Sequence, residues 1–558
     1  MYNEDGKDKI EPKAVQAPAD IESGAVDEVQ SGSISKTKRG LKSRHAQMIA
    51  IGGTIGTGLF VGSGQALAAG GPLFLFLGYT VMTALVFGII TATAEMSTYL
   101  PLEGMTMAYF GSRYVSPSLG FAMGWLYWYS FAIIAPYEIT AAAVVIDYWP
   151  NNVPIAVWIT IFLVIIIALN CFPVRYYGET EFWLASLKVM MIIGLLMLSM
   201  ILFWGGGPNR DRLGFRYWAE SATHEKYVKG STGRFCAFLY TLIYSTFSFN
   251  FAPELLVITA GEMASPTVNM PKAAKRYFWR LIIFYVGGAF AIGVIISSRN
   301  TDLVNASGVN ASPWVIAVKE AGIHGLDSVI NAVIITSAFS SGNSYVYMAT
   351  RSLYSLAIAG NAPRVFTRCT KGGIPYMALL GTCPWLLLAY MNVSEAAGTV
   401  FNWFINLTNT AGFTSWVCCS VIYVRFRKAR MVQGVHEVAW TSRLQPYASY
   451  VCGVAFTILC LLNGFGVFIK GNWSTDTFLT SYLGLPVFFA IYLGHRLVNW
   501  KDAWAYRPED IDITSGRDEV AALHREDTIE GRGKAWSTKE ERCRGAEGHM
   551  GIGKRRSG

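Results

Sequence analysis

Residues 48–64 read MIAIGGTIGTGLFVGSG, an apolar stretch that carries six glycines from Gly52 to Gly64. Each glycine costs about 1 kcal/mol relative to alanine in an isolated helix, so an uninterrupted helix is disfavoured here. One explanation is close packing of membrane helices through small residues. The other is an unwound segment at 53–58, which backbone adopts in mid-membrane only where it lines a cavity or binds a ligand. A dinucleotide-binding loop is excluded, because no strand precedes the glycines and the GxGxxG spacing is absent.

A second interruption is predicted at 247–256, which reads FSFNFAPELL. Pro253 lacks a backbone donor and frees a carbonyl one turn earlier, and Asn250 and Glu254 lie beside it in an apolar run. Interrupted helices at matching positions in two halves of a chain are the sequence sign of an inverted-repeat transporter. A half-helix that begins near Gly58 presents N–H groups to a carboxylate, while a segment that ends near Asn250 presents carbonyls to an ammonium. We therefore predict a site for a zwitterionic α-amino acid.

The composition is that of a membrane protein. Of the 558 residues 52% are hydrophobic and only 15% are charged, whereas about 25% of the residues in a soluble protein are charged. Apolar runs near the roughly 20 residues needed to cross the hydrocarbon core recur along the chain. The sequence predicts an all-α membrane protein with twelve transmembrane helices, at 47–69, 73–95, 118–147, 154–171, 184–204, 235–260, 280–298, 327–357, 375–392, 399–424, 447–469 and 477–498.

The segments between these helices indicate the orientation. Basic residues gather before the first helix and after the sixth, eighth and tenth helices, which places these segments and both termini in the cytoplasm. The connector 205–234 is also basic, although this scheme places it outside the cell. A long connector is weaker evidence for orientation than short loops are. We predict a cytoplasmic N-terminal tail (1–46), a transport core of helices 1–10 (47–424), helices 11 and 12 with the cytoplasmic loop before them (425–498) and a cytoplasmic C-terminal tail (499–558).

Several polar side chains fall inside the predicted helices. Glu138 lies near the membrane midplane, where a carboxylate costs about 2.5–3.5 kcal/mol, so we assign it to substrate binding or proton coupling; a structural hydrogen bond is the alternative. Lys188 lies one turn inside the fifth helix and either snorkels to the interface or exchanges a proton as a desolvated amine. Glu254, at the second interruption, orients the backbone or closes a gate. Ser340 and Ser341 complete the proton-coupling candidates, although small polar residues also pack helices.

The candidate substrate site surrounds the two interruptions. Phe247 and Phe249, with Trp403 and Phe404 in the tenth helix, are candidates for aromatic walls, although most aromatic side chains here face lipid or pack between helices. The predicted substrate-binding residues are Thr54, Ile55, Gly56, Thr57, Gly58, Glu138, Phe247, Ser248, Phe249, Asn250, Trp403 and Phe404.

Blocks of sequence between residues 44 and 517 resemble the fungal amino-acid permeases of the amino acid–polyamine–organocation superfamily. The matching blocks are GGTIGTGLFVGSG (52–64), SLGFAMGWLYWYS (118–130), PELLVITAGE (253–262), SSGNSYVYMATRSLYSLA (340–357) and FNWFINLTNTAGFTSW (401–416). The resemblance implies a five-plus-five inverted repeat with helices 1 and 6 broken, two extra helices, and proton-coupled uptake of amino acids at the plasma membrane. It also implies that Lys188 lies beside the first and eighth helices, where sodium-driven relatives hold a cation.

Within this family, FNFAPELLVITAGEM (249–263) and KAAKRYFWRLIIFYV (272–286) look most like the proline-specific and neutral amino-acid permeases. Proline is therefore the favoured substrate. Two alternatives remain open: a general neutral amino-acid permease, and a non-transporting amino-acid sensor or transceptor. Sensors often carry unusually long cytoplasmic extensions, and the predicted tails here are of ordinary length for a permease.

Other classes of function are disfavoured. The sequence has no CxxC metal spacing, HExxH motif or intramembrane histidine pair, so we expect no enzyme, no metal and no cofactor, with the proton gradient as driving force. The net charge of +9 fits contact with anionic membrane lipids rather than nucleic acid. Lys7, Lys9 and Lys13 in the N-terminal tail are candidate sites for ubiquitin ligases and the endocytic machinery.

Overall fold

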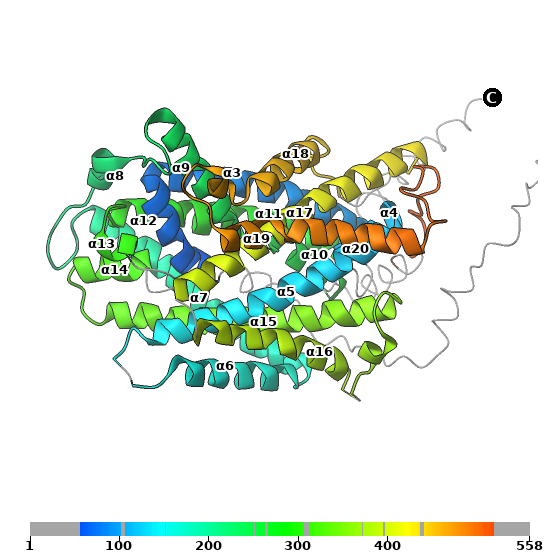
Figure 1. The fold of residues 1–558 in the computed structure, drawn as a ribbon, viewed down its shortest axis with the longest axis horizontal. Helices are drawn as coiled ribbons and strands as arrows, with labels where there is room; N and C mark the ends of the chain where they lie inside the picture. The colour runs from blue at the N-terminus through cyan, green and yellow to red at the C-terminus, as the bar shows by residue number, and fades with distance from the viewer. Residues whose placement is uncertain are drawn as a thin grey trace, which may run out of the picture.

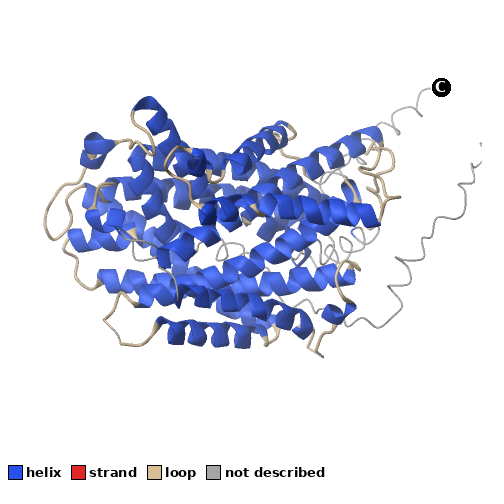
Figure 2. Ribbon diagram, viewed as in Figure 1, coloured by secondary structure: helices blue, strands red, loops and turns tan. Residues whose placement is uncertain are grey.

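The computed structural model describes residues 56–101, 106–150, 152–249, 251–262, 266–305, 312–370, 372–393, 397–435, 440–517 and 520. Throughout these ranges the chain is helical, and they contain no β-strand (Figure 2). A helix lies in each of the twelve predicted membrane segments.

The helices follow one another along the chain through short connectors. Up to the second interruption they are η2 (Gly58–Gly62), α3 (Ser63–Tyr99), α4 (Met107–Tyr114), α5 (Pro117–Ile146), α6 (Ile155–Asn170), α7 (Val174–Phe203), α8 (Arg216–Ser221), α9 (Gly230–Ser245) and η3 (Thr246–Phe249). After it they are α10 (Ala252–Glu262), α11 (Pro266–Arg280), η4 (Leu281–Val286), α12 (Gly287–Ile295), α13 (Thr301–Asn305), α14 (Pro313–Glu320), α15 (Leu326–Ile358), η6 (Arg364–Thr367), α16 (Tyr376–Leu386), η7 (Leu387–Val393), α17 (Ala397–Val432), α18 (Tyr447–Leu462), η8 (Phe465–Phe468), α19 (Thr475–Tyr482) and α20 (Gly484–Val498).

The first two predicted segments are joined by a kink instead of a loop. α3 continues through both, but Gly71 has a φ of 82° and Pro72 follows it. A Cβ at Gly71 would lie 2.8 Å from the carbonyl oxygen of Ala222, and glycine adopts positive φ without a steric cost. The Ala222 carbonyl accepts the N–H of Leu73 at 3.0 Å, which satisfies a donor that the kink exposes.

The sixth predicted segment is interrupted, as its proline motif indicates. α9 gives way to the 3₁₀ turn η3, and α10 begins two residues before Glu254 with Pro253 in its first turn. Between them Phe251 has a φ of 54°, which is uncommon for a bulky residue. Its ring is fully buried against Phe131 of α5, with centroids 5.2 Å apart. Packing therefore holds the backbone in this conformation at the break.

Two long helices, α5 and α15, form the most extensive contact of the fold and lie side by side (Figure 1). α6, α7 and α16 also pack against α15, while α3 packs against α9, α10 and α12. α17 packs against α5, α3 and α18, and α18 also packs against α3. The middle of α15 buries polar side chains, among them Ser340, Ser341 and Asn343, so the interior of the helix assembly is polar at this level.

Seven helical stretches of the described chain are long and apolar enough to cross a membrane, and α6 and α18 are shorter apolar helices. α15 and α17 have 33 and 36 residues and carry polar side chains in their buried faces. The fold is thus an all-helical, multi-pass membrane fold. The count of twelve crossings, the five-plus-five repeat and the predicted limits of the tails and core stay predictions.

After α20 the chain folds back over one end of the helix assembly. We call residues 505–517 the C-terminal strap. Its main-chain carbonyls accept hydrogen bonds from the side chains of Tyr99 in α3, Arg113 in α4 and Gln433 at the end of α17. Two of its isoleucines are buried. The strap therefore joins three helices at the end for which the basic segments predict a cytoplasmic location.

Candidate functional site

Glu138 joins α5 to the start of the first helix. Its carboxylate is buried, and Oε2 accepts a hydrogen bond from Thr57 Oγ1 at 3.1 Å. Gly56 lies so close that a Cβ there would be 2.8 Å from Glu138 Oε1 and 3.1 Å from Ser341 Oγ of α15. Glycine is needed at this position because a side chain would displace the carboxylate. The predicted site residues Gly56, Thr57, Glu138 and Ser341 therefore meet at one point.

Lys188 reaches the same point from α7. Its side chain has no exposed surface, and Nζ donates a hydrogen bond to Ser341 Oγ at 3.3 Å. The ammonium also interacts electrostatically with the carboxylates of Glu181 and Glu138. The side chain thus points into the protein and does not snorkel to an interface.

Glu181 belongs to this cluster and was missed by the sequence analysis. Both of its carboxylate oxygens lie 2.8 Å from Ser340 Oγ, which donates to them, and the carboxylate is fully buried. Glu181 precedes Lys188 by seven residues, so the two side chains lie two turns apart on one face of α7. This spacing was available in the sequence and could have identified the pair. Ser340 therefore contacts Glu181, and Ser341 contacts Lys188.

Aromatic side chains line the break beside Glu138. The ring of Tyr137 lies 4.8 Å from Phe247 of η3, 4.9 Å from Phe401 and 6.4 Å from Phe404, measured between centroids. Its hydroxyl is 3.2 Å from Thr57 Oγ1. Phe247 and Phe404 were predicted as wall residues, whereas Tyr137 and Phe401 were not singled out. Nothing in the sequence marks Tyr137 beyond its position next to Glu138.

The start of η2 touches η3, at the break of the sixth predicted segment. Of the interruption predicted at 53–58, residues 53–55 lie outside the described residues. A Cβ on Gly58 would lie 3.0 Å from Ser248 Cα and 3.1 Å from Phe247 Cδ1, so the backbones of η2 and η3 approach closely because residue 58 has no side chain. Ser248 Oγ shares a hydrogen bond of 2.8 Å with Tyr79 Oη of α3. Phe249 stacks on Tyr285, with ring centroids 4.6 Å apart, and its ring lies 5.7 Å from that of Tyr79.

Two of the predicted residues make their contacts elsewhere. Glu254 accepts hydrogen bonds from Ser415 Oγ at 2.5 Å and from Trp416 Nε1 at 3.4 Å, both on α17. Trp403 donates from Nε1 to Asp476 Oδ2 at 2.9 Å, toward α19 and away from Tyr137. Glu254 therefore ties the broken helix to α17, and Trp403 lies outside the aromatic cluster.

Three predicted residues, Thr54, Ile55 and Asn250, lie outside the described residues. In the part of the chain that the structure describes, no group of three or more His, Cys, Asp or Glu side chains is arranged to hold a metal ion. The site instead has three parts. The first is the start of η2, where Thr57 makes no side-chain capping bond. The other two are a buried cluster of charged and hydroxyl groups and a wall of aromatic side chains. This set can bind a small zwitterion and move a proton beside it.

The chain is similar to known amino acid permeases over most of its length. The family model of amino acid permeases matches residues 45–504. A proline-specific permease of Emericella nidulans is 45% identical over 494 residues, which make up 87% of this chain and 90% of the relative. A probable proline-specific permease of Schizosaccharomyces pombe is 45% identical over 480 residues, which cover 84% and 87% of the two chains. Among solved structures, a mutant manganese transporter of Eremococcus coleocola aligns over 82% of this chain and 94% of its own, with a TM-score of 0.54 at 12% identity, a likeness of fold alone.

Proposed function

Because this chain belongs to the amino acid permease family, whose members are membrane transporters and not enzymes, we propose that it imports amino acids across the plasma membrane by proton symport, with proline as favoured substrate. The preference for proline rests on the 45% identity to proline-specific permeases over most of both chains. The structural observation that carries the proposal is the close approach of Gly58, at the start of η2, to Ser248 and Phe247 at the break of the sixth segment. The family resemblance drawn from the sequence motifs is confirmed.

The proposed substrate site uses both interruptions. The N–H groups of the turn that begins η2 lie at the positive end of a helix dipole and suit the carboxylate of the substrate. The carbonyls at the end of η3 suit its ammonium. Tyr137, Phe247 and Phe404 offer apolar surface to the ring of proline.

The proposed proton carrier is Lys188. Its buried ammonium is attracted by Glu138, and Glu138 holds Thr57 at the start of the first helix. Loss of the Lys188 proton to the cytoplasm weakens this attraction and frees the first helix to move against α5. Alternating access then consists of a movement of the broken helices relative to α5 and α15, with the backbone at Phe251 as a hinge.

The proposed orientation follows the basic segments. The end of α17 carries Arg425, Arg427, Lys428 and Arg430, and the excess of basic residues in short segments marks the cytoplasmic side. Both termini then lie in the cytoplasm, where the lysines of the N-terminal tail are within reach of ubiquitin ligases. No cofactor enters this mechanism, since the proton gradient supplies the driving force.

Uptake of radiolabelled proline by a permease-deficient yeast strain that expresses the full chain tests the proposal. We expect uptake that a protonophore abolishes and that other unlabelled amino acids compete with poorly. Equal competition by many neutral amino acids would replace the proline assignment with a general neutral permease. Absence of uptake of every labelled amino acid, with the protein present at the cell surface, would contradict the transporter and favour a sensor.

A further inference from the structure

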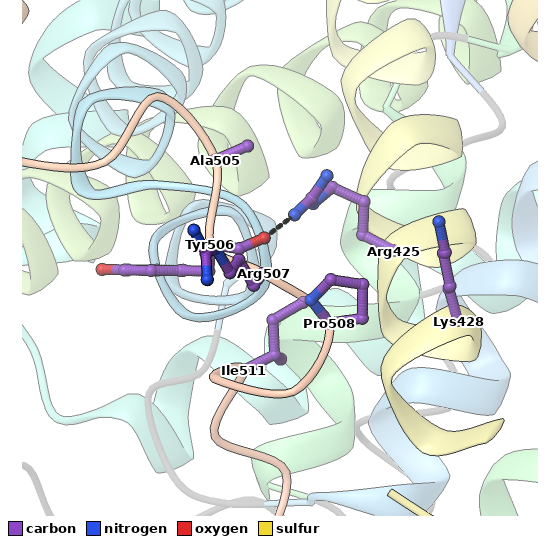
Figure 3. Close-up of a pocket in the computed structure, with 7 residues that line it drawn as sticks. All are labelled: Arg425, Lys428, Ala505, Tyr506, Arg507, Pro508 and Ile511. Atoms are coloured by element: carbon purple, nitrogen blue, oxygen red, sulfur yellow. Dashed lines mark hydrogen bonds between the residues drawn. The ribbon is translucent and has the colours of Figure 1, made fainter. Parts of the chain in front are cut away.

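The C-terminal strap and the end of α17 enclose a cavity that has no part in the proposed transport cycle. It measures about 260 Å³ and is lined by Arg425 and Lys428 of α17 on one wall and by residues 505–508 with Ile511 on the other (Figure 3). Its charged side chains, Arg425, Lys428 and Arg507, are all cations. The cavity exists only when the strap lies against α17.

Arg425 spans the cavity and fixes its shape. Its Nε donates to the carbonyl oxygen of Tyr114 at 3.2 Å, and its terminal NH2 group donates to the carbonyl oxygen of Tyr506 on the strap. Both acceptors are neutral, so they orient the guanidinium without cancelling its charge. The remaining N–H groups of the guanidinium stay available for a ligand.

The three cations form no ion pair within the described part of the chain. The ion pairs there involve Arg113, Arg216, Arg234 and Arg430, and none involves Arg425, Lys428 or Arg507. Cations that share a small cavity repel one another, and an anion between them relieves that repulsion. The cavity is therefore complementary to a ligand with more than one negative charge.

The surroundings place this cavity at the level of lipid headgroups. Trp500 and Trp504 follow α20 and are 72% and 60% exposed, and Trp504 directly precedes the cavity wall. Exposed tryptophans of this kind concentrate at the interface between membrane and water. Because the end of α17 is basic, we take this headgroup level to be that of the cytoplasmic leaflet, which carries anionic lipids.

We propose that this cavity binds the phosphorylated headgroup of a phosphoinositide in the cytoplasmic leaflet. A phosphomonoester carries about two negative charges near neutral pH, which suits three cations, whereas a phosphatidylserine headgroup carries one net charge. Arg425 and Arg507 offer paired N–H donors to phosphate oxygens, and Lys428 adds a point charge. Because one wall is the strap and the other is α17, a bound headgroup stabilises the docked strap. The proposal depends on the orientation of the chain but not on which amino acid is transported.

The test measures thermal unfolding of the purified full-length protein in detergent. The added ligands are short-chain phosphatidylinositol 4,5-bisphosphate, short-chain phosphatidylserine, free inositol trisphosphate and inorganic phosphate. We expect the phosphoinositide to raise Tm at the lowest concentration. In the double variant Lys428→Gln/Arg507→Gln its apparent affinity should fall at least about tenfold, the effect of losing charge-assisted hydrogen bonds. Arg425 is left unchanged because its bonds hold the strap in place.

The matched control removes two charges from the same end of the molecule without touching the cavity. Arg443 and Lys501 are exposed and do not line it, so Arg443→Gln/Lys501→Gln should keep the phosphoinositide affinity within about twofold. An equal loss in both double variants would mean non-specific attraction and overturn the proposal. If free inositol trisphosphate stabilised the protein equally, the ligand would not be a lipid. If phosphatidylserine did so equally, the preference for a phosphomonoester would be overturned. If no ligand shifted Tm, the proposed binding site would be overturned.

Discussion

The hydroxyl of Thr57 donates a hydrogen bond to the carboxylate of Glu138 at 3.1 Å, which joins the start of the first helix to the middle of α5. Gly56 lies against the other carboxylate oxygen, Oε1. Any movement of the backbone at 56–58 therefore changes the surroundings of Glu138. Since Glu138 in turn attracts Lys188, this contact links the proposed substrate site to the proposed proton carrier.

Replacing Thr57 tests that link. Thr57→Val keeps the shape of the side chain and removes the donor to Glu138. A hydrogen bond to a charged group contributes about 1.5–3 kcal/mol, so kcat/KM for proline uptake should fall about tenfold to hundredfold. Uptake kinetics at matched surface expression measure the change. Thr80→Val is the control, because Thr80 bonds only to the carbonyl of Phe76 in its own helix; equal losses in both variants would refute the link.

The close approach of η2 and η3 at Gly58 predicts that even the smallest side chain is not tolerated there. In Gly58→Ala the new Cβ would lie 3.0 Å from Ser248 Cα, a main-chain atom that cannot move aside cheaply. We expect proline uptake to fall by at least about tenfold while the protein still reaches the surface, since overpacking typically costs about 1–3 kcal/mol. Gly194→Ala in α7, where no atom lies within 4 Å of the added Cβ, should keep its uptake. Normal uptake by Gly58→Ala would show that transport does not need the close approach of η2 and η3.

Glu181 has a predicted role in proton coupling. Glu181→Gln keeps an acceptor for Ser340 but removes one of the two carboxylates that attract Lys188. Proton-driven net uptake should fall at least about tenfold, while exchange of internal for external proline, which needs no net proton movement, should stay within about threefold. The half-exposed Glu179 on the same helix supplies the control variant Glu179→Gln. A parallel loss of net uptake and exchange in Glu181→Gln would indicate a structural role only.

Glu254 has a predicted structural role through α17. Ser415→Ala removes a buried hydrogen-bond donor to the Glu254 carboxylate. A buried acceptor that loses its donor costs about 1–3 kcal/mol of stability. We expect a lower Tm with little change in the KM for proline. Ser420→Ala is the comparison, because Ser420 bonds only to the carbonyl of Trp416 in its own helix. An unchanged Tm together with a raised KM would instead place Glu254 in the substrate site.

The C-terminal strap should release in acid. Burial raises the pKa of Asp512, but its hydrogen bonds with Ser515 and Thr514 and the charge of Arg113 outweigh this and hold the pKa below its ordinary value. A lowered folded-state pKa gives stability that is present at neutral pH and is lost as pH falls below about 3.9 toward the folded value. Limited proteolysis at residues 505–517 should therefore accelerate in that range. In Asp512→Asn it should be fast already at neutral pH, and slow cleavage of that variant would contradict the account.

Local chemistry explains which features were predictable from the sequence. Pro253 acts on its own backbone, so the interruption of the sixth segment was visible as a pattern. Glu138 and Lys188 stood out as charges in apolar runs. The contacts of Tyr137 with Phe401 and of Glu254 with Ser415 join segments far apart in the chain, and a single sequence holds no record of such pairs. Trp403 was proposed as a wall residue because of its expected position near the breaks, but its side chain donates to Asp476 in a different helix.

Proton movement driven by proline tests the central proposal most directly. The purified protein is placed in liposomes with a pH-sensitive dye inside, equal pH on both sides and an inward gradient of proline. We predict acidification of the lumen on addition of proline, and none in Lys188→Met even where proline exchange persists. Proline accumulation without acidification by the unaltered protein, or acidification of equal size in Lys188→Met, would contradict proton coupling through Lys188.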